Sequence, residues 1–420
     1  MSEKNTVNSA DEMSVLNMLK EGRITAGEAE ELLETLRLID ENDDNRDSRE
    51  KPSGGRTNED NRGPLFKSDP PNINLSALSS IGKEISNAMS GFTKNMKDIF
   101  RDFGKYGFSA FEDLPNSADG ICEDVISGED IREIRIRNFR GNIKVKGDEK
   151  EGAIKIKAEL TAKAESPEAA RNAVENFKLE INVDGGIAEI KPPRDKEADK
   201  ALLSIDFFIE VPSRLRVLAQ NGGGDFNVSH ISGGLGCKLG SGDVEARDCR
   251  EAINLETKRG NIELFGGNGT IRLFTRSGNV KTENAGGLIS AESLSGNVEA
   301  ANCRGVCELS SKSGNIKAID CEVDRLKGST NSGNVELKPE LKDNFVIEAS
   351  SLSGSLKVIV PSAVSAEIIA STMSGSVKLG DFIFAGEKSR GKVNGKIGGA
   401  DNIGGSINLK TLSGDIKLSS

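Results

Sequence analysis

From residue 221 onward, apolar and polar positions alternate, and the alternation itself repeats. The sequence Ser-Gly-Asn/Asp-Val/Ile returns with small departures, at an even spacing up to Gly314 and at a slightly longer spacing beyond it. The marking glycines are Gly224, Gly242, Gly260, Gly278, Gly296, Gly314, Gly333, Gly354, Gly375 and Gly414, with a degenerate copy at Gly395. A fixed period in this range predicts a β-solenoid, a stack of turns of about 18–21 residues each.

Within each repeat, the apolar residues occupy fixed columns. The positions two, eleven and thirteen residues after the glycine are mostly apolar, and the residues between them are mostly polar. This period of two predicts two short strands in each turn, with one face directed inward. The glycine permits a positive φ at the corner, and the Asn or Asp after it suits a turn.

Cysteines occupy a further column, seven positions after the glycine. Cys249, Cys303 and Cys321 lie there, and Gly267 and Ala285 fill the same column in other repeats. The favoured interpretation is a column of small inward residues, where cysteine packs as a small hydrophobe. The alternative is a redox-active or metal-binding pair at Cys303 and Cys321. It is disfavoured because no histidine is near and the charges that activate a thiolate are not evident.

Before the repeats, the pattern changes three times. Residues 10–38 show two short apolar stripes with a break between them, which predicts a small α-helical hairpin. Residues 40–73 are polar and rich in charge, Gly and Pro, which is typical of a disordered linker. Residues 123–220 alternate irregularly and include a helix start at Ser166-Pro167-Glu168, so they are predicted to be a β-rich cap of the solenoid, which itself spans 221–420.

Residues 75–108 predict an amphipathic helix. Its apolar residues recur in steps of three or four, and basic residues fall on the opposite face. Such a helix can join copies of the chain, lie on an anionic membrane surface or dock on its own domain, and the arrangement of charge does not decide between these. The apolar face includes Ile85, Phe92, Met96, Ile99 and Phe103.

Composition narrows the function classes. The net charge of −10 disfavours general nucleic-acid binding, which needs a clustered basic surface. The single histidine, His230, lowers the expectation of acid–base or metal chemistry, and no cofactor is predicted. No secretory signal opens the sequence and no segment approaches about 20 apolar residues, so we expect a cytoplasmic protein, either free or peripheral to the membrane.

Residues 386–393, Gly-Glu-Lys-Ser-Arg-Gly-Lys-Val, resemble a phosphate-binding loop. The position after the lysine must be Ser or Thr to reach a magnesium ion, and here it is Val393. Nucleotide binding is therefore not expected.

The repeats and the N-terminal motif together resemble a known family. Ser277-Gly278-Asn279-Val280 and its copies are similar to the DUF4097 family of adhesin-like β-repeat proteins. Leu19-Lys-Glu-Gly-Arg-Ile-Thr-Ala-Gly-Glu-Ala29 resembles the SHOCT-like helical module that precedes such domains in the YvlB and LiaX group. The resemblance implies a bacterial protein with a β-solenoid body and, in some relatives, a link to cell-envelope stress. It implies no catalytic residues.

We therefore expect a non-enzymatic scaffold that self-associates through its N-terminal helices, with an unidentified protein partner and no nucleic acid. One alternative is a peripheral membrane sensor that uses the helix at 75–105. The other is a polysaccharide-acting β-helix enzyme, for which Asp225, Asp243 and Asp415 would be candidates, although turn chemistry explains these residues. Because the sequence ends inside a repeat, the last turn is expected to pair with a second copy or a partner.

Overall fold

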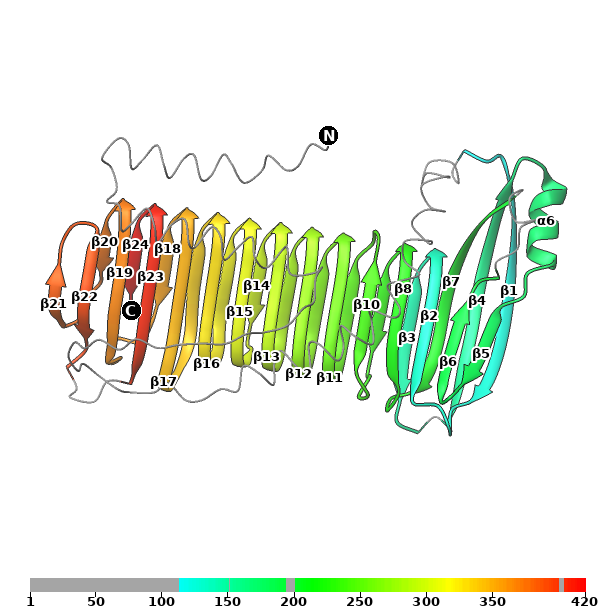
Figure 1. The fold of residues 1–420 in the computed structure, drawn as a ribbon, viewed down its shortest axis with the longest axis horizontal. Helices are drawn as coiled ribbons and strands as arrows, with labels where there is room; N and C mark the ends of the chain where they lie inside the picture. Colours follow the sequence, from blue (N-terminus) through cyan, green and yellow to red (C-terminus); the bar gives the residue numbers. More distant parts are fainter. Residues whose placement is uncertain (1–112, 151, 194–200, 400–403) are drawn as a thin grey trace, which may run out of the picture. The chain divides into compact units, whose positions relative to one another are not determined.

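The computed structural model describes residues 113–150, 152–193, 201–399 and 404–420. The predictions for 10–38, 40–73 and 75–108 lie outside these residues. The described part is mainly β and consists of turns stacked on one another, so the predicted β-solenoid is confirmed (Figure 1).

Each regular turn, which we name by its repeat glycine, contributes to two stacks of parallel strands. The post-glycine stack holds segments that begin two residues after a repeat glycine, and the pre-glycine stack holds segments that run into the next one. Neighbouring turns are in register, so Val244 pairs with Ile262 and Ile253 pairs with Ile271. The strands up to the Gly354 turn are β8 (Arg216–Gly223), β9 (Phe226–Ser229), β10 (Leu235–Leu239), β11 (Val244–Arg259), β12 (Ile262–Ser277), β13 (Val280–Ser295), β14 (Val298–Ala301), β15 (Arg304–Ser313), β16 (Ile316–Ser332), β17 (Val335–Ser353) and β18 (Leu356–Ile359).

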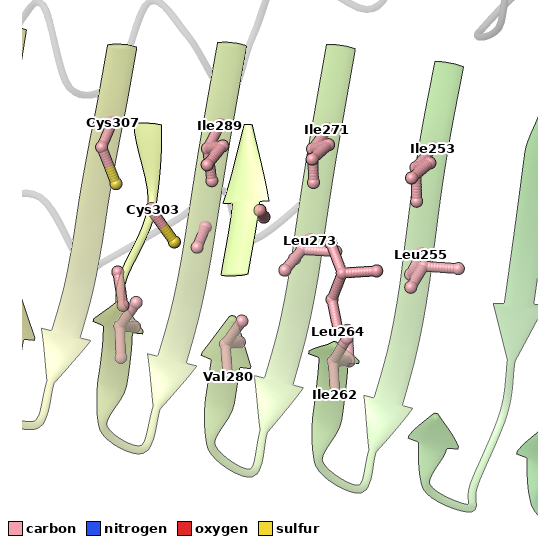
Figure 2. Packing of buried hydrophobic residues seen from close by; sticks show 14 of the residues in the cluster. Ile253, Leu255, Ile262, Leu264, Ile271, Leu273, Val280, Ile289, Cys303 and Cys307 are labelled. Carbon is pink, nitrogen blue, oxygen red and sulfur yellow. The ribbon is translucent and has the colours of Figure 1, made fainter. Parts of the chain in front are cut away.

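The core lies between the two stacks. Its rows run along the solenoid because each apolar column places one side chain on every turn. Figure 2 shows one such row, Ile253, Ile271, Ile289 and Cys307, at most 2% exposed. Burying a side chain such as Ile or Leu fully is worth about 1.5–3 kcal/mol, and because the rows run from turn to turn, contacts between neighbouring turns contribute to this burial.

The N-terminal cap is an antiparallel sheet joined to this stack. β1 (Asn116–Ser127) pairs with β4 (Ala153–Ala164), and β4 pairs with β7 (Ala201–Pro212). β5 (Glu180–Asp184) and β6 (Ile187–Lys191) form a hairpin, and β6 pairs in parallel with residues 133–136. The predicted helix is α6 (Pro167–Glu175); the Ser166 hydroxyl accepts a hydrogen bond from the Ala169 amide at 3.2 Å, as an N-cap does.

The first turn of the solenoid lies inside the cap sequence. β2 (Glu133–Arg140) joins the pre-glycine stack beside β8, and β3 (Ile143–Asp148) joins the post-glycine stack beside β9. The glycine at their corner, Gly141, is far from Gly224 in sequence but lies directly beside it in the stack. Cap and solenoid therefore interleave along the sequence rather than meeting at residue 220.

The C-terminal end departs from sequence order. β23 (Gly405–Ser413) pairs with β17 on one side and with β19 (Ala366–Ser374) on the other. β24 (Ile416–Ser419) likewise lies between β18 and β20 (Val377–Leu379). Figure 1 shows these last strands, in red, between the orange strands of earlier residues. The Gly414 turn is thus inserted between the Gly354 and Gly375 turns.

Two expectations are wrong here. The last repeat of the sequence does not form an exposed terminal turn, because it has a neighbouring turn on both sides. Nor is Gly395 a degenerate repeat corner. It lies within β22 (Lys392–Ile397), which pairs antiparallel with both β19 and β21 (Phe384–Lys388). This short hairpin covers the Gly375 turn and acts as the cap that the repeat pattern did not reveal.

Candidate functional site

The glycine corners are held together by close contact between turns. Gly242, Gly260 and Gly278 have φ values of 126°, 142° and 142°, which L residues rarely adopt. A Cβ atom on Gly242 would collide with the carbonyl oxygen of Gly224 in the preceding turn, and every other repeat glycine has the same contact. The ten predicted turn glycines therefore lie in one column, and their role in the described structure is the packing of corners.

The Asn and Asp side chains that follow the glycines form a ladder of hydrogen bonds from turn to turn. The Asn261 side-chain oxygen accepts a hydrogen bond from the Asn279 amide at 2.8 Å, and Asn279 accepts one from Asn297 at 2.8 Å. Asp225 and Asp243 occupy the same column and accept from the next turn at 2.8 and 2.7 Å. These carboxylates are thus engaged in turn-to-turn hydrogen bonds rather than gathered in a cleft, as a polysaccharide-acting site would require.

Asp415 ends this ladder. Its Oδ1 atom accepts hydrogen bonds from the amide and the hydroxyl of Ser376, at 2.8 and 2.9 Å. These bonds lower the pKa of the carboxyl, and the charges of Lys378 and Arg390 act in the same direction. The carboxylate therefore stays ionised and fixes the inserted turn to the Gly375 turn.

A second ladder was missed by the sequence reasoning. The Thr275 hydroxyl donates a hydrogen bond to the Gly260 carbonyl at 2.9 Å, and Ser293 donates to Gly278 at 2.8 Å. Its signal is a Ser or Thr three positions before the glycine, in every repeat from Gly260 on. The residues of this ladder are Thr257, Thr275, Ser293, Ser311, Thr330, Ser351, Thr411 and Thr372, all buried.

His230 lies at another corner, six positions after Gly224. Its φ of 59° is matched by 52° at Asp248, 57° at Asn284 and 52° at Asn302 in the same column. Asn, Asp and His are the residues other than Gly that best tolerate this left-handed conformation. The ring is exposed and its Nδ1 atom lies 3.8 Å from Asp248 Oδ2. The role of His230 in the described structure is therefore to form the turn.

The cysteine column faces the core. Cys249, Cys303 and Cys321 are fully buried. Burial raises the pKa of Cys249 to about 11. Cys303 and Cys321 lie on neighbouring turns, and the hydrogen bond between their thiols lowers the pKa of Cys303 and raises that of Cys321. Among the described residues, no group of three or more His, Cys, Asp or Glu side chains is placed to hold a metal ion.

The lateral faces carry charges of both signs. Lys238 pairs with Glu256 at 3.2 Å, Lys281 with Glu283 at 3.4 Å, and Lys338 with Asp320 at 2.9 Å. Surface pairs of this kind contribute at most about 1 kcal/mol each, so they shape the surface more than the stability. The large apolar side chains exposed among the described residues lie instead toward the two ends of the solenoid. They are Ile121, Val125, Val183 and Phe208 at one end and Leu352, Ile369, Met373 and Ile383 at the other.

The segment 386–393, which resembles a phosphate-binding loop, spans the end of β21, the hairpin loop and the start of β22. A strand and not a helix follows the loop, so the segment lacks the strand-loop-helix frame of a nucleotide site. Ile85, Phe92, Met96, Ile99 and Phe103 lie outside the described residues. Within the described residues, no helix combines the length and the apolar character that crossing a bilayer requires.

The comparisons with known proteins agree with the repeat pattern. Residues 306–419 match the family model described as Toastrack DUF4097, so the resemblance to DUF4097 is confirmed for that part of the chain. The SHOCT-like segment lies outside the match. No curated protein matches the chain.

Several solved structures are similar over most of their own length. A "putative adhesin" from Parabacteroides distasonis ATCC 8503 is 10% identical with a TM-score of 0.34, covering 71% of this chain and 97% of that one. A "putative lipid binding protein" from the same organism is 13% identical with a TM-score of 0.29, covering 71% and 96%. A "putative adhesin" from Bacteroides fragilis NCTC 9343 is 15% identical with a TM-score of 0.27, covering 71% and 97%. At these TM-scores, function has to be argued from the residues of this chain.

Proposed function

We propose that this chain, with its DUF4097 domain at residues 306–419, is a non-enzymatic interaction scaffold of the bacterial cell-envelope stress response. The N-terminal helices join copies of the chain, and the solenoid presents its faces to a protein partner. One observation carries the proposal: the recurring polar residues of the repeat, which would be the candidates for chemistry, are used in ladders that bind turn to turn.

The architecture supports this role in a second way. Because each turn is in register with the next, the outward side chains form straight rows along both faces. Such rows give a long, rigid surface whose pattern is set by substitutions at outward positions, without disturbing the core. This arrangement suits recognition of an extended partner better than it suits catalysis in a pocket.

Self-association through the N-terminal helices can be tested by substitutions in the predicted helix at 25–38. Exchanging Leu33 and Leu36 for Glu in the full chain places charges on the predicted apolar stripe of the helix at 25–38. We expect the unaltered chain to sediment as an oligomer and this variant to sediment as a monomer in analytical ultracentrifugation.

The matched control exchanges Glu31 and Glu34 for Gln, on the opposite face of the same helix. It should remain oligomeric. A monomeric unaltered chain, or a Leu33→Glu/Leu36→Glu variant that sediments like the control, would contradict self-association through this helix.

A further inference from the structure

The last three turns of the solenoid expose an apolar row. Leu352, Leu412 and Met373 each lie two residues before their glycine, on the outward face of the pre-glycine stack. They are neighbours because β23 lies between β17 and β19, with Ser351 paired to Thr411 and Thr411 paired to Thr372. Leu352 is 40% exposed and Met373 is 51% exposed, whereas Leu412 between them is half-buried.

The insertion of the Gly414 turn sets the order of the side chains in this row. In sequence order, Leu352 and Met373 would be neighbours and Leu412 would lie at the end of the stack. Ile369, which is 47% exposed, extends the apolar surface along β19, since it lies four residues before Met373 on the same face.

Basic residues are interleaved with these apolar side chains. Lys410 lies on the outward face of β23, two residues before Leu412, and its strand neighbours are Ser350 and Ser371. Lys392 pairs with Ser371 from the other side. We name the six residues Leu352, Ile369, Met373, Lys392, Lys410 and Leu412 the C-terminal patch.

The carboxylates around the patch have other partners or lie at its border. Glu348 is bonded to Arg325 at 3.0 Å, and Glu367 lies opposite Lys396. Glu387 is on β21, beyond Asn394. Asp415 is bonded to Ser376 and lies near Arg390 at the corner. Among the described residues, none of these carboxylates forms an ion pair with Lys392 or Lys410, unlike the paired lysines of the central turns.

We propose that the C-terminal patch docks on an anionic lipid bilayer. Two lysines of this kind among exposed aliphatic side chains match a surface with phosphate groups over hydrocarbon. A second copy of the same patch is a poor occupant, because a two-fold contact would bring the lysines of both copies together on an apolar face.

The geometry supplies a simple mode of binding. Lysine stems can lie along the apolar row while their ammonium groups reach lipid phosphates. Met373, Ile369 and Leu352 are exposed on strands that their neighbours hold rigid, so they can enter the interface without unfolding of the turn. This binding is independent of the helix at 75–108 and of self-association, although several linked copies would strengthen it.

The test is flotation of the full chain with vesicles of phosphatidylglycerol and phosphatidylcholine. All proteins carry Phe92→Glu, which removes binding through the predicted helix at 75–108. We expect this chain to float with the anionic vesicles at low salt and not with phosphatidylcholine alone. Adding Lys392→Glu and Lys410→Glu should weaken binding by about 25-fold or more, because each lysine near an anionic surface contributes about fivefold and the two factors multiply.

Two further variants separate the parts of the proposal. Ile369→Thr with Met373→Thr should weaken binding with the charges intact, which a purely electrostatic attraction would not show. Lys312→Glu with Lys327→Glu makes the same charge change on the same face nearer the middle of the solenoid, and it should leave binding within about twofold.

The proposal is overturned if the Phe92→Glu chain does not float with anionic vesicles, or if both lysine pairs weaken binding equally. Binding to an acidic protein without binding to vesicles would also overturn it. If the proposed self-association fails instead, the chain is monomeric but the difference between the two lysine pairs persists, so the two failures can be told apart.

Discussion

At the scale of the residue, the corner glycines illustrate two constraints acting at one position. Gly296 has a φ of 151° and its missing Cβ leaves room for the Gly278 carbonyl. The Asn after it suits the turn and also links neighbouring turns, since Asn297 accepts a hydrogen bond from Asn315 at 2.8 Å. The residue types of the motif are therefore dictated by contact between turns as much as by the turn itself.

Gly296→Ala should lower the free energy of unfolding by about 3 kcal/mol or more, because the φ is strained and the Cβ meets a backbone oxygen. Ser295→Ala, one residue earlier and exposed, should change it by less than about 0.5 kcal/mol. Urea unfolding of both full-length variants measures the difference. Equal stability of the two would show that the corners are not in close contact.

At the scale of the element, the inserted strands β23 and β24 contribute more to stability than terminal strands usually do. Each pairs on both sides, and together they bury Ile407, Leu409, Ile416 and Leu418. Full burial of four such side chains is worth roughly 6–12 kcal/mol. The end of the sequence therefore holds the Gly354 and Gly375 turns together.

Removing residues 405–420 should open the C-terminal end of the solenoid. The inward faces of two turns would lose their neighbour, so we expect rapid proteolysis between residues 335 and 399, read by mass spectrometry. Removing only Ser419 and Ser420 is the control and should leave the protease resistance unchanged. A chain that stops at Gly404 and still resists protease would contradict the inserted position of β23 and β24.

At the scale of the whole molecule, the solenoid behaves as a one-dimensional stack in which each turn contacts only its neighbours. The turns from Gly224 to Gly314 have the same length and the same columns, so one of them can be replaced by the next. Function then depends on outward rows and on the two ends, where the exposed large apolar residues are found.

Deleting Asn279–Gly296 removes one whole repeat and restores Ser-Gly-Asn-Val at the junction. We expect this shortened chain to fold with an unchanged circular dichroism spectrum and a Tm within about 10 °C of the unaltered chain, because one nearest-neighbour contact is lost among many. Deleting Asn279–Gly287, half a repeat, shifts the alternation by an odd number of positions and turns apolar residues outward, so it should aggregate. Similar behaviour of the two deletions would argue against a register-dependent stack.

Much of this architecture follows from local sequence pattern. The period of the glycines predicts the turns, and the alternation predicts the inward columns, because both depend on residues a few positions apart. The early turn at Gly141 also had a signal, since Arg140-Gly-Asn-Ile143 repeats the four residues Arg259-Gly-Asn-Ile262, but its distance from the other copies hid it.

Only the tertiary structure decided the order of the turns at both ends. A repeat sequence specifies how one turn fits another, yet neighbouring turns are nearly equivalent, so the pattern does not say which turn lies next to which. The Gly414 turn lies between two earlier turns because the β21–β22 hairpin covers the Gly375 turn and leaves the Gly354 turn open for pairing. The same insertion arranges the C-terminal patch, since it places Lys410 and Leu412 of β23 between Leu352 of β17 and Met373 of β19.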